Sequence, residues 1–289
     1  MNYVLHLLVY FEIFTIVSLS LNLLLGYGGL LQIAHAAYYG VGAYTAVLLS
    51  TKLGFSFFGG LFVGGLVAGA MSVLVSLPAW KFKGDYFFMV SLAVQTLIYA
   101  GLYNWVSLTN GPFGLSGIER PTIAGYIFVT TQSIAVLYGI LVIGLATVMA
   151  LIKLSPFGKA LQAMRDDEQA ARSVGISVEK MKLLSFAISS FMVGIAGGLY
   201  ATYVSYIDPT SFSLNESILM ISMVIVGGTG NVRGPIIGAL VLILLPELLR
   251  FIQVPDAIGA NLRLLAYGLL IVLMMLFRPQ GLAGAYRYK

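Results

Sequence analysis

The chain has no cysteine, and only 9% of its 289 residues are charged. The lack of cysteine excludes a disulfide framework, a thiolate metal site and a cysteine nucleophile. The charged share lies far below the roughly 25% of an ordinary soluble protein, while 59% of the residues are hydrophobic and the mean hydropathy is +0.95. Because a spanning helix needs about 20 apolar residues, the chain has room for about ten spans at most and for no sizeable soluble domain. The composition therefore predicts an integral membrane protein.

The sequence also lacks the residue groupings that catalysis needs. It contains no nucleophile triad, no paired catalytic carboxylates and no His/Asp metal cluster at a chemical spacing. It has no glycine-rich run ending in Gly-Lys-Ser/Thr, which a phosphate cradle requires. No Lys or Arg precedes the first apolar run, so a cleaved signal peptide is not expected. We therefore expect a chain that is not an enzyme, binds no ATP itself and holds no metal or cofactor.

Nine apolar runs, separated by charges or by Gly and Pro, predict nine membrane segments. They lie at 3–25, 30–50, 56–78, 86–105, 132–152, 183–206, 216–228, 235–253 and 261–277. The second run is interrupted by Gln32, His35 and several glycines, and the seventh is short, so each is a candidate for a broken or re-entrant segment. The expected fold is all-α and polytopic, with residues 1–289 forming one transmembrane domain.

The distribution of Lys and Arg predicts the orientation, because loops on the cytoplasmic side retain basic residues. With the N-terminus outside, nine spans place twelve basic residues inside and four outside, and the inverted arrangement reverses the bias. The inside set is Lys81, Lys83, Lys153, Lys159, Arg165, Arg172, Lys180, Lys182, Arg233, Arg278, Arg287 and Lys289, and the outside set is Lys52, Arg120, Arg250 and Arg263. We therefore expect an outside N-terminus and a cytoplasmic C-terminus.

One segment, residues 153–182, is unlike the rest of the chain. It holds ten charged side chains, namely Lys153, Lys159, Arg165, Asp166, Asp167, Glu168, Arg172, Glu179, Lys180 and Lys182. Ser155 is a suitable helix cap, Pro156 suits a first turn and Gly175 is a natural stop, which together predict a cytoplasmic helix over 156–174.

The same helix carries an apolar stripe, formed by Phe157, Leu161, Met164 and Ala171 at helical spacing. An apolar stripe on a charged helix indicates a partner surface. The alternative is a solvated connector whose stripe rests on the ends of the chain's own spans.

Five stretches resemble known signatures. The first stretch runs from Gln169-Ala170-Ala171 to Gly175, with three residues between. It resembles the core of the loop by which ABC importer permeases dock on their ATPases, which has Glu-Ala-Ala, three residues and then Gly. It departs from that pattern in having Gln in place of Glu and no Leu-Pro pair further on. Four others resemble branched-chain amino acid permeases in order and spacing, nearly end to end. They are residues 22–45, with Gly26-Tyr27-Gly28-Gly29 and His35, residues 109–118, Thr-Asn-Gly-Pro-Phe-Gly-Leu-Ser-Gly-Ile, residues 226–239, with Gly227-Gly228-Thr229-Gly230, and Arg278-Pro279-Gln280-Gly281-Leu282.

The resemblance implies a permease subunit that imports branched-chain or similar hydrophobic amino acids through a bacterial or archaeal inner membrane. Its implied partners are a second permease, identical or different, two cytoplasmic ATPases and an extracytoplasmic solute-binding protein. The implied ATPase-coupling residues are Ser155, Pro156, Gly158, Ala160, Arg165, Asp167, Glu168, Ala170, Ala171 and Gly175. Two alternatives stay open, a permease for urea or short amides and an ion-coupled secondary transporter, which would also be polytopic with broken helices.

Polar side chains within the apolar runs are candidates for the translocation path. They are Glu12, Asn22, Gln32, His35, Tyr44 and Gln95. An unpaired carboxylate at mid-bilayer costs about 3 kcal/mol, so Glu12 should face protein or water. For each candidate the alternative is interior packing, since amides and hydroxyls also bridge helices. The closely spaced glycines of residues 59–69 predict a helix contact rather than a ligand site.

Overall fold

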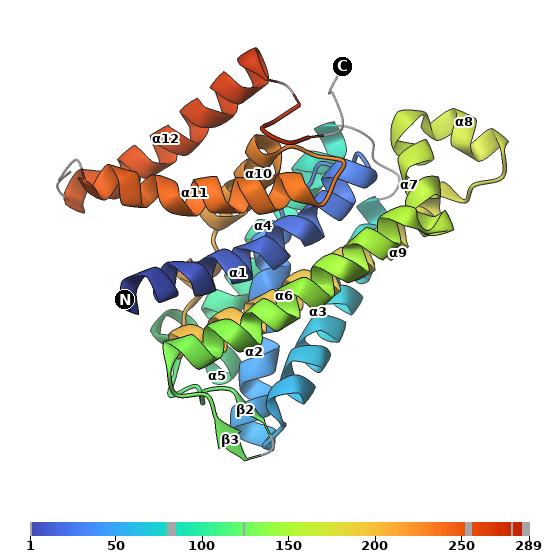
Figure 1. Ribbon diagram of the computed structural model, residues 1–289. Coiled ribbons are helices and arrows are strands. Elements are labelled where there is room, and N and C mark those ends of the chain that lie inside the picture. The colour runs from blue at the N-terminus through green and yellow to red at the C-terminus, as the bar shows by residue number, and fades with distance from the viewer. Residues whose placement is uncertain (1, 80–84, 124, 252–255, 279, 285–289) are drawn as a thin grey trace.

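The computed structural model describes residues 2–79, 85–123, 125–251, 256–278 and 280–284, and most of this part of the chain is helical (Figure 1). The longer helices are α1 Asn2–Asn22, α2 His35–Leu53, α3 Phe57–Ala79, α4 Asp85–Asn104, α6 Thr131–Leu154, α9 Val178–Val204, α10 Leu214–Gly227, α11 Arg233–Phe251 and α12 Asp256–Phe277. The shorter elements are the π-helix η1 Leu23–Tyr27, α5 Val106–Thr109, α7 Pro156–Asp166, α8 Glu168–Ser173 and the 3-10 helices η2 Gly111–Phe113 and η3 Pro209–Phe212.

Four two-residue strands qualify the all-α expectation. Strand β1 (Leu115–Ser116) pairs antiparallel with β4 (Tyr206–Ile207), and β2 (Thr122–Ile123) pairs antiparallel with β3 (Tyr126–Ile127). The β1–β4 pair joins the connection before α6 to the connection between α9 and α10. The strands therefore fasten loops at one end of a helical protein.

Six helical stretches in the described part of the chain are long and apolar enough to cross a membrane. They are Tyr3–Tyr27, Phe57–Ser76, Tyr86–Asn104, Thr131–Leu154, Val178–Val204 and Pro209–Gly227. The predicted segments that became α2, α11 and α12 are helices but are not among these six. The chain is thus a multi-pass membrane protein. Residues 252 and 253, at the end of the predicted eighth span, and Lys81, Lys83, Arg287 and Lys289 of the inside set lie outside the described residues.

Two sequence predictions about local structure were wrong in detail. The second segment does not begin at residue 30, because α1 continues into η1 and an irregular stretch before α2 starts at His35. The single helix predicted over 156–174 is two helices. It breaks at Asp167, whose backbone is extended (φ −156°, ψ 108°) and whose carboxylate accepts the N–H groups of Gln169 and Ala170 at 2.8 and 3.0 Å. The Asp167 side chain therefore starts α8 as a new helix.

The glycines of α3 make the helix contact that their spacing predicts. A Cβ at Gly64 would lie 2.8 Å from the carbonyl oxygen of Gly42 in α2, and one at Gly65 would lie 2.8 Å from that of Phe191 in α9. A Cβ at Gly197 of α9 would overlap the carbonyl oxygen of Tyr39. Helices α2, α3 and α9 therefore pack backbone against backbone.

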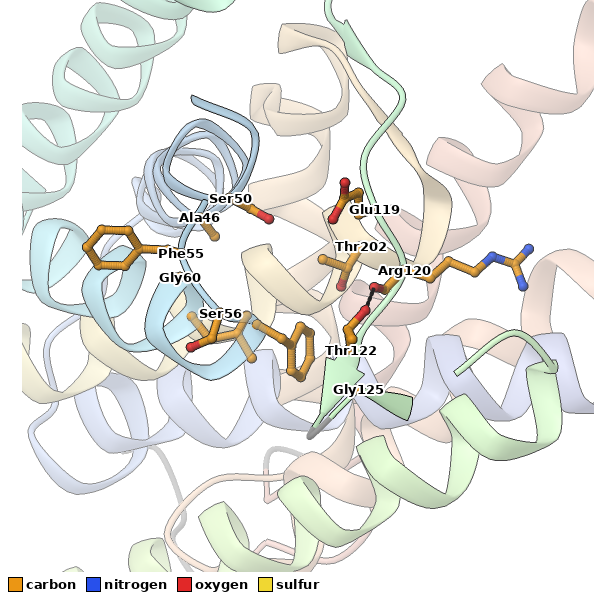
Figure 2. Close-up of a pocket in the computed structure, with 12 residues that line it drawn as sticks. Ala46, Ser50, Phe55, Ser56, Gly60, Glu119, Arg120, Thr122, Gly125 and Thr202 are labelled. Atoms are coloured by element: carbon orange, nitrogen blue, oxygen red, sulfur yellow. Dashed lines mark hydrogen bonds between the residues drawn. The ribbon is translucent and has the colours of Figure 1, made fainter. Parts of the chain in front are cut away.

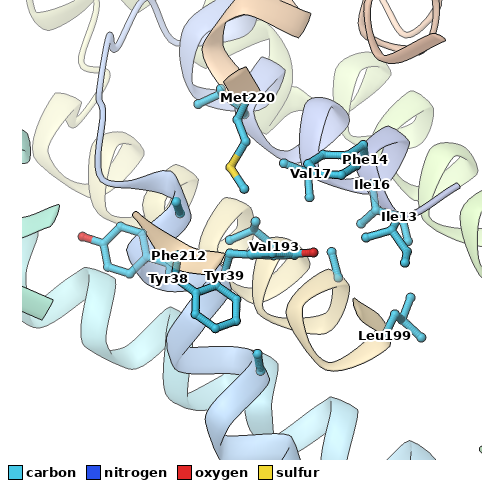
Figure 3. Close-up of a cluster of buried hydrophobic side chains, with 14 of the residues drawn as sticks. Ile13, Phe14, Ile16, Val17, Tyr38, Tyr39, Val193, Leu199, Phe212 and Met220 are labelled. Atoms are coloured by element: carbon cyan, nitrogen blue, oxygen red, sulfur yellow. The ribbon is translucent and has the colours of Figure 1, made fainter. Parts of the chain in front are cut away.

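The main hydrophobic core lies where α1 crosses this three-helix unit (Figure 3). Apolar side chains of α1 face residues of α2, α9, η3 and α10, and each is nearly or completely buried. The side chains labelled in the figure are Ile13, Phe14, Ile16, Val17, Tyr38, Tyr39, Val193, Leu199, Phe212 and Met220. This core holds α1 against α9 and α10, and the candidate residue Asn22 lies at the end of α1 that follows it.

Candidate functional site

The charged segment begins at a tight turn between α6 and α7. Ser155 Oγ accepts the N–H of Gly158 at 3.2 Å and donates to the carbonyl oxygen of Ile152 at 2.6 Å, and Pro156 is the first residue of α7. A Cβ at Gly158 would overlap the same Ile152 carbonyl oxygen, so this position requires glycine. The cap predicted at Ser155 is therefore present, and it directs α7 across the ends of the long helices (Figure 1).

The apolar stripe of the segment faces the protein's own interior. Leu161, Met164 and Ala171 are 0%, 4% and 3% exposed, and they pack in a second hydrophobic cluster with Tyr27 of η1 and Met149 of α6. The stripe therefore rests on the ends of the chain's own helices, as one of the two sequence interpretations held. Any partner surface of the segment must lie on its opposite side.

The opposite side of the segment is exposed around α8. Gln169 and Ala170 are exposed, Val174 is 75% exposed, and Gly175 has the positive φ (+88°) that its role as a helix stop predicted. Half-buried Ala160 lies on α7. Helix α8 thus presents small and polar side chains outward.

Ion pairs tie α8 to the start of α9. Arg172 contacts Glu168 at 3.0 Å and Glu179 at 2.6 Å, and Lys182 contacts Glu168 at 3.2 Å. The carboxylates of Glu168 and Glu179 raise the pKa of Arg172 above its ordinary value. The pairs join α8 to α9 and do not involve the exposed Gln169 and Ala170.

Arg165 connects α7 to the break between α1 and α2. Its Nη1 donates to the carbonyl oxygen of Gly26 in η1 at 2.6 Å, while Nε and Nη2 donate to Asp166 Oδ1 at 3.0 and 2.9 Å. The side chain is 11% exposed, in contrast to 60% for that of Asp166. The Arg165 side chain therefore points into the protein, whereas that of the neighbouring Asp166 faces outward.

Asn22, a path candidate, is completely buried and connects α1 to the loop between α10 and α11. Its Nδ2 donates to the carbonyl oxygen of Asn231 at 2.9 Å, and its Oδ1 accepts the N–H of Gly230 at 3.3 Å. Asn231 in turn donates to the carbonyl oxygen of Ala283 and accepts the N–H of Gly234. In this structure Asn22 is a cross-link between segments far apart in the sequence.

The C-terminal stretch binds the end of α10, next to the loop that Asn22 contacts. The N–H groups of Leu282 and Ala283 donate to the carbonyl oxygens of Val226 and Gly227, each at 2.9 Å. Three of the stretches that resemble permease signatures therefore meet beside the charged segment. The fourth, residues 109–118, contributes β1, which pairs with β4 at the end of α9 far from that segment (Figure 1).

Gln95, another path candidate, caps the beginning of α2. Its Oε1 accepts the N–H of Ala37 at 2.9 Å and its Nε2 donates to the carbonyl oxygen of Phe212 at 2.8 Å. Ser217 Oγ accepts the N–H of Ala36 at 3.0 Å, and Ser91 Oγ accepts that of Ile33 at 3.0 Å. Residues of α4 and α10 thus satisfy the N–H groups that a helix beginning inside the protein leaves unpaired. The sequence interpretation missed Ser91 and Ser217, because serine is common in such helices and carries no distinguishing spacing.

His35 and Gln32 belong to the same buried group. Gln32 Nε2 lies 3.2 Å from His35 Nδ1, and Ser20 Oγ lies 2.9 Å from His35 Nε2. Ser20 Oγ also donates to the carbonyl oxygen of Val17 at 2.7 Å, so His35 Nε2 is the donor to Ser20. Neither Gln32 nor His35 is more than 1% exposed. In this structure both side chains face protein, and Gln32 also borders a small cavity of about 10 Å³ that Tyr38, Ser76 and Phe87 help to line.

The remaining path candidates, Tyr44 and Glu12, are also buried. The Tyr44 ring packs edge-on against Phe212 at 5.8 Å. Glu12 faces α6, where a Cβ at Gly139 would lie 3.1 Å from Glu12 Oε1. Within the described part of the chain, Glu12 Oε2 and the Tyr44 hydroxyl have no hydrogen-bond partner.

A cavity of about 290 Å³ lies at the other end, among α2, the start of α3, the β2–β3 hairpin and the end of α9 (Figure 2). Its polar lining includes Ser50, Ser56, Glu119 and Thr202. The guanidinium of Arg120 points away from it, while Thr122 Oγ1 donates to the Arg120 carbonyl oxygen at 3.2 Å. The sequence analysis counted Arg120 for the orientation of the chain but did not single out Glu119, the one acidic residue among the described residues of this lining.

Several apolar helices long enough to span a membrane, with a charged segment folded onto their ends, are the architecture of a polytopic membrane protein. The family model described as "Branched-chain amino acid transport system / permease component" matches residues 3–277, and the chain belongs to that family.

Curated relatives agree with this assignment. The chain is 34% identical to the high-affinity branched-chain amino acid transport system permease protein LivM of Escherichia coli (strain K12), over 93% of this chain and 67% of the relative. It is 26% identical to the probable permease LivM of Methanocaldococcus jannaschii (96% and 92%), and 26% identical to the probable permease LivH of the same organism (96% and 90%). No solved structure matches the chain.

Proposed function

We propose that this chain is a membrane-spanning permease subunit of an ATP-driven importer, which moves branched-chain amino acids into the cytoplasm of a bacterium or archaeon. The observation that carries the proposal is the charged segment 153–182, packed across the helix ends where the permease signatures converge. Residues 1–289 act as one transmembrane domain, and this segment couples it to the ATPases. Hydrolysis on another subunit can move the helices only through such a contact.

The proposed complex contains a second permease, two cytoplasmic ATPases and an extracytoplasmic solute-binding protein. The relatives named LivM and LivH in one organism favour a second permease that differs from this chain. The ATPase contact is the exposed face of α8, with Gln169 and Ala170, together with Val174. Buried Ala171 supports that face from beneath by allowing α8 to approach the core.

A reconstituted complex tests this function directly. We expect ATP-dependent uptake of leucine, isoleucine or valine that survives collapse of the ion gradient. Preferential uptake of urea or short amides would instead support the related-permease alternative. Uptake that needs no ATP and stops when the ion gradient collapses would make the chain a secondary transporter and overturn the proposal.

The proposal also includes an orientation, with nine membrane segments, an outside N-terminus and a cytoplasmic C-terminus. The twelve-to-four distribution of basic residues supports it. So does the arrangement of α1, whose first residue lies far from α7 and α8 (Figure 1). If the coupling segment is cytoplasmic, that end of α1 must be outside.

Two serine-to-cysteine variants test the orientation in a chain with no native cysteine. Ser173→Cys, in α8, should react with a membrane-impermeant thiol reagent only after the cytoplasmic side is opened. Ser116→Cys, in β1, should react from the outside of intact cells. Both serines are exposed, whereas Thr109 in the same outer stretch is 2% exposed and would be a poor reporter. Labelling of both cysteines from one side would contradict the nine-segment arrangement.

A further inference from the structure

Because Arg165 joins the coupling segment to the broken end of α1, we propose that it is a positioning residue for transport. In this proposal, the Arg165–Gly26 hydrogen bond and the Asn22 side chain form a relay from the coupling segment to the α1–α2 break and the α10–α11 loop. The inference rests on the proposed function and adds to it the internal route by which movement of α7 reaches the membrane helices.

The first link is a charged side chain bound to backbone. Arg165 Nη1 donates to the Gly26 carbonyl oxygen at 2.6 Å, a short distance typical of a charge-assisted hydrogen bond. Asp166 holds the other side of the guanidinium at 2.9 and 3.0 Å and thereby fixes its orientation. Gly26 lies in a π-helix, an element that is rare and concentrated at functional sites.

The second link is the close packing of α7 against the chain beside the Arg165–Gly26 hydrogen bond. Gly29 has φ +65°, and a Cβ there would lie 2.7 Å from Arg165 Cγ. Leu161 of α7 is fully buried and belongs to the same hydrophobic cluster as Tyr27 of η1. Because packed interiors transmit displacement rather than absorb it, a shift of α7 should move η1 and the Gly28–Gly29 turn.

The third link is the contact of η1 and Asn22 with the loop between α10 and α11. A Cβ at Gly26 would overlap Asn22 Oδ1 and lie 2.9 Å from the Gly230 nitrogen, so η1 directly contacts the α10–α11 loop. Asn22 binds that loop with both ends of its amide, at Gly230 and Asn231. Asn231 also binds Gly234 at the start of α11 and Ala283 in the C-terminal stretch. One anchor on α7 therefore reaches α1, α10, α11 and the C-terminal stretch.

The test measures solute transported per ATP hydrolysed in the assembled complex. Arg165→Gln should keep its ATPases and hydrolyse ATP, yet transport about tenfold or more less solute per ATP. Arg165→Lys should restore part of the loss, because a single ammonium group keeps the charge but cannot bind Gly26 and Asp166 in the same fixed geometry. Lys52→Gln, which removes one charge at the far end of α2, should keep the wild-type ratio.

A second variant keeps the proposal testable if Arg165→Gln does not assemble. Asn231→Ala keeps the backbone groups that Asn22 binds, but removes the partly buried side chain that links the loop to Gly234 of α11 and to Ala283. It should lower the same ratio by interrupting the last step of the relay. In a double variant, the two losses should not multiply if both residues act in one relay. Multiplied losses, or a wild-type ratio in both single variants, would overturn the relay. Absence of ATP-driven uptake by the wild-type complex would instead be a failure of the proposed function.

Discussion

Glu in place of Ala171 is expected to release α8 from the permease, whereas Glu in place of Ala170 is expected to leave the permease folded and weaken only its hold on the ATPase. The two alanines are neighbours in sequence, but Ala171 is 3% exposed and Ala170 is exposed. A carboxylate at 171 would be buried in the hydrophobic cluster that contains Leu161, Met164 and Val178, at an effective cost of the order of several kcal/mol. Thermal unfolding of the isolated permease should therefore show a clear loss of stability for Ala171→Glu.

At position 170 the new side chain meets the partner instead. A surface helix accepts Glu readily, so the isolated permease should unfold as the wild type does. At a close interface the added bulk costs about 1–3 kcal/mol, which corresponds to ATPase retention weakened about 5- to 150-fold. Wild-type retention and uptake in Ala170→Glu would show that this face of α8 is not the coupling contact.

Gln95→Leu is expected to destabilise the protein, because the amide connects three parts of the fold. The change would leave the Ala37 N–H and the Phe212 carbonyl oxygen without their partner, and would remove an acceptor of Ser217. Each unsatisfied buried group costs about 1–3 kcal/mol, so a total loss of about 2–6 kcal/mol is expected. The midpoint of thermal unfolding in detergent should fall accordingly.

Asn104→Leu is the matched control, since it removes an exposed amide of the same helix that donates only to Ala100 within one turn. It should change the midpoint little. If Gln95→Leu were as stable as the wild type but changed solute preference, Gln95 would belong to the translocation path rather than to a helix cap. The same comparison can be made for Gln32→Leu and His35→Leu.

The positions of the helices could be read from the sequence because bilayer thickness sets the length of an apolar run. Most boundaries fell within a few residues, and the glycine contact of α3 was visible as spacing. The break at Asp167 was missed because a carboxylate in mid-helix can either face solvent or start a new helix, and the choice depends on where α8 must pack. The burial of Ala171 and the exposure of Ala170 also depend on where α8 packs, so the sequence alone could not distinguish the two alanines.

Long-range pairing could not be predicted from the single sequence. Asn22 was selected as a polar residue in a span, but its partners are 208 and 209 residues away. Gln95 was weighed between path and packing, and only the Ala37 and Phe212 contacts show what it holds in this structure. Local pattern identifies a buried polar group, whereas its partner depends on how distant segments fold together.

The contact among α2, α3 and α9 also limits how the molecule can change shape. Where backbones touch through Gly42, Gly64 and Gly197, no side-chain rotamers lie between the helices to be rearranged. Such an interface has few alternative packings, so we expect the three helices to behave as a stationary frame during a transport cycle. Helix movement during transport would then be confined to contacts made through side chains, such as those of α1 with α10.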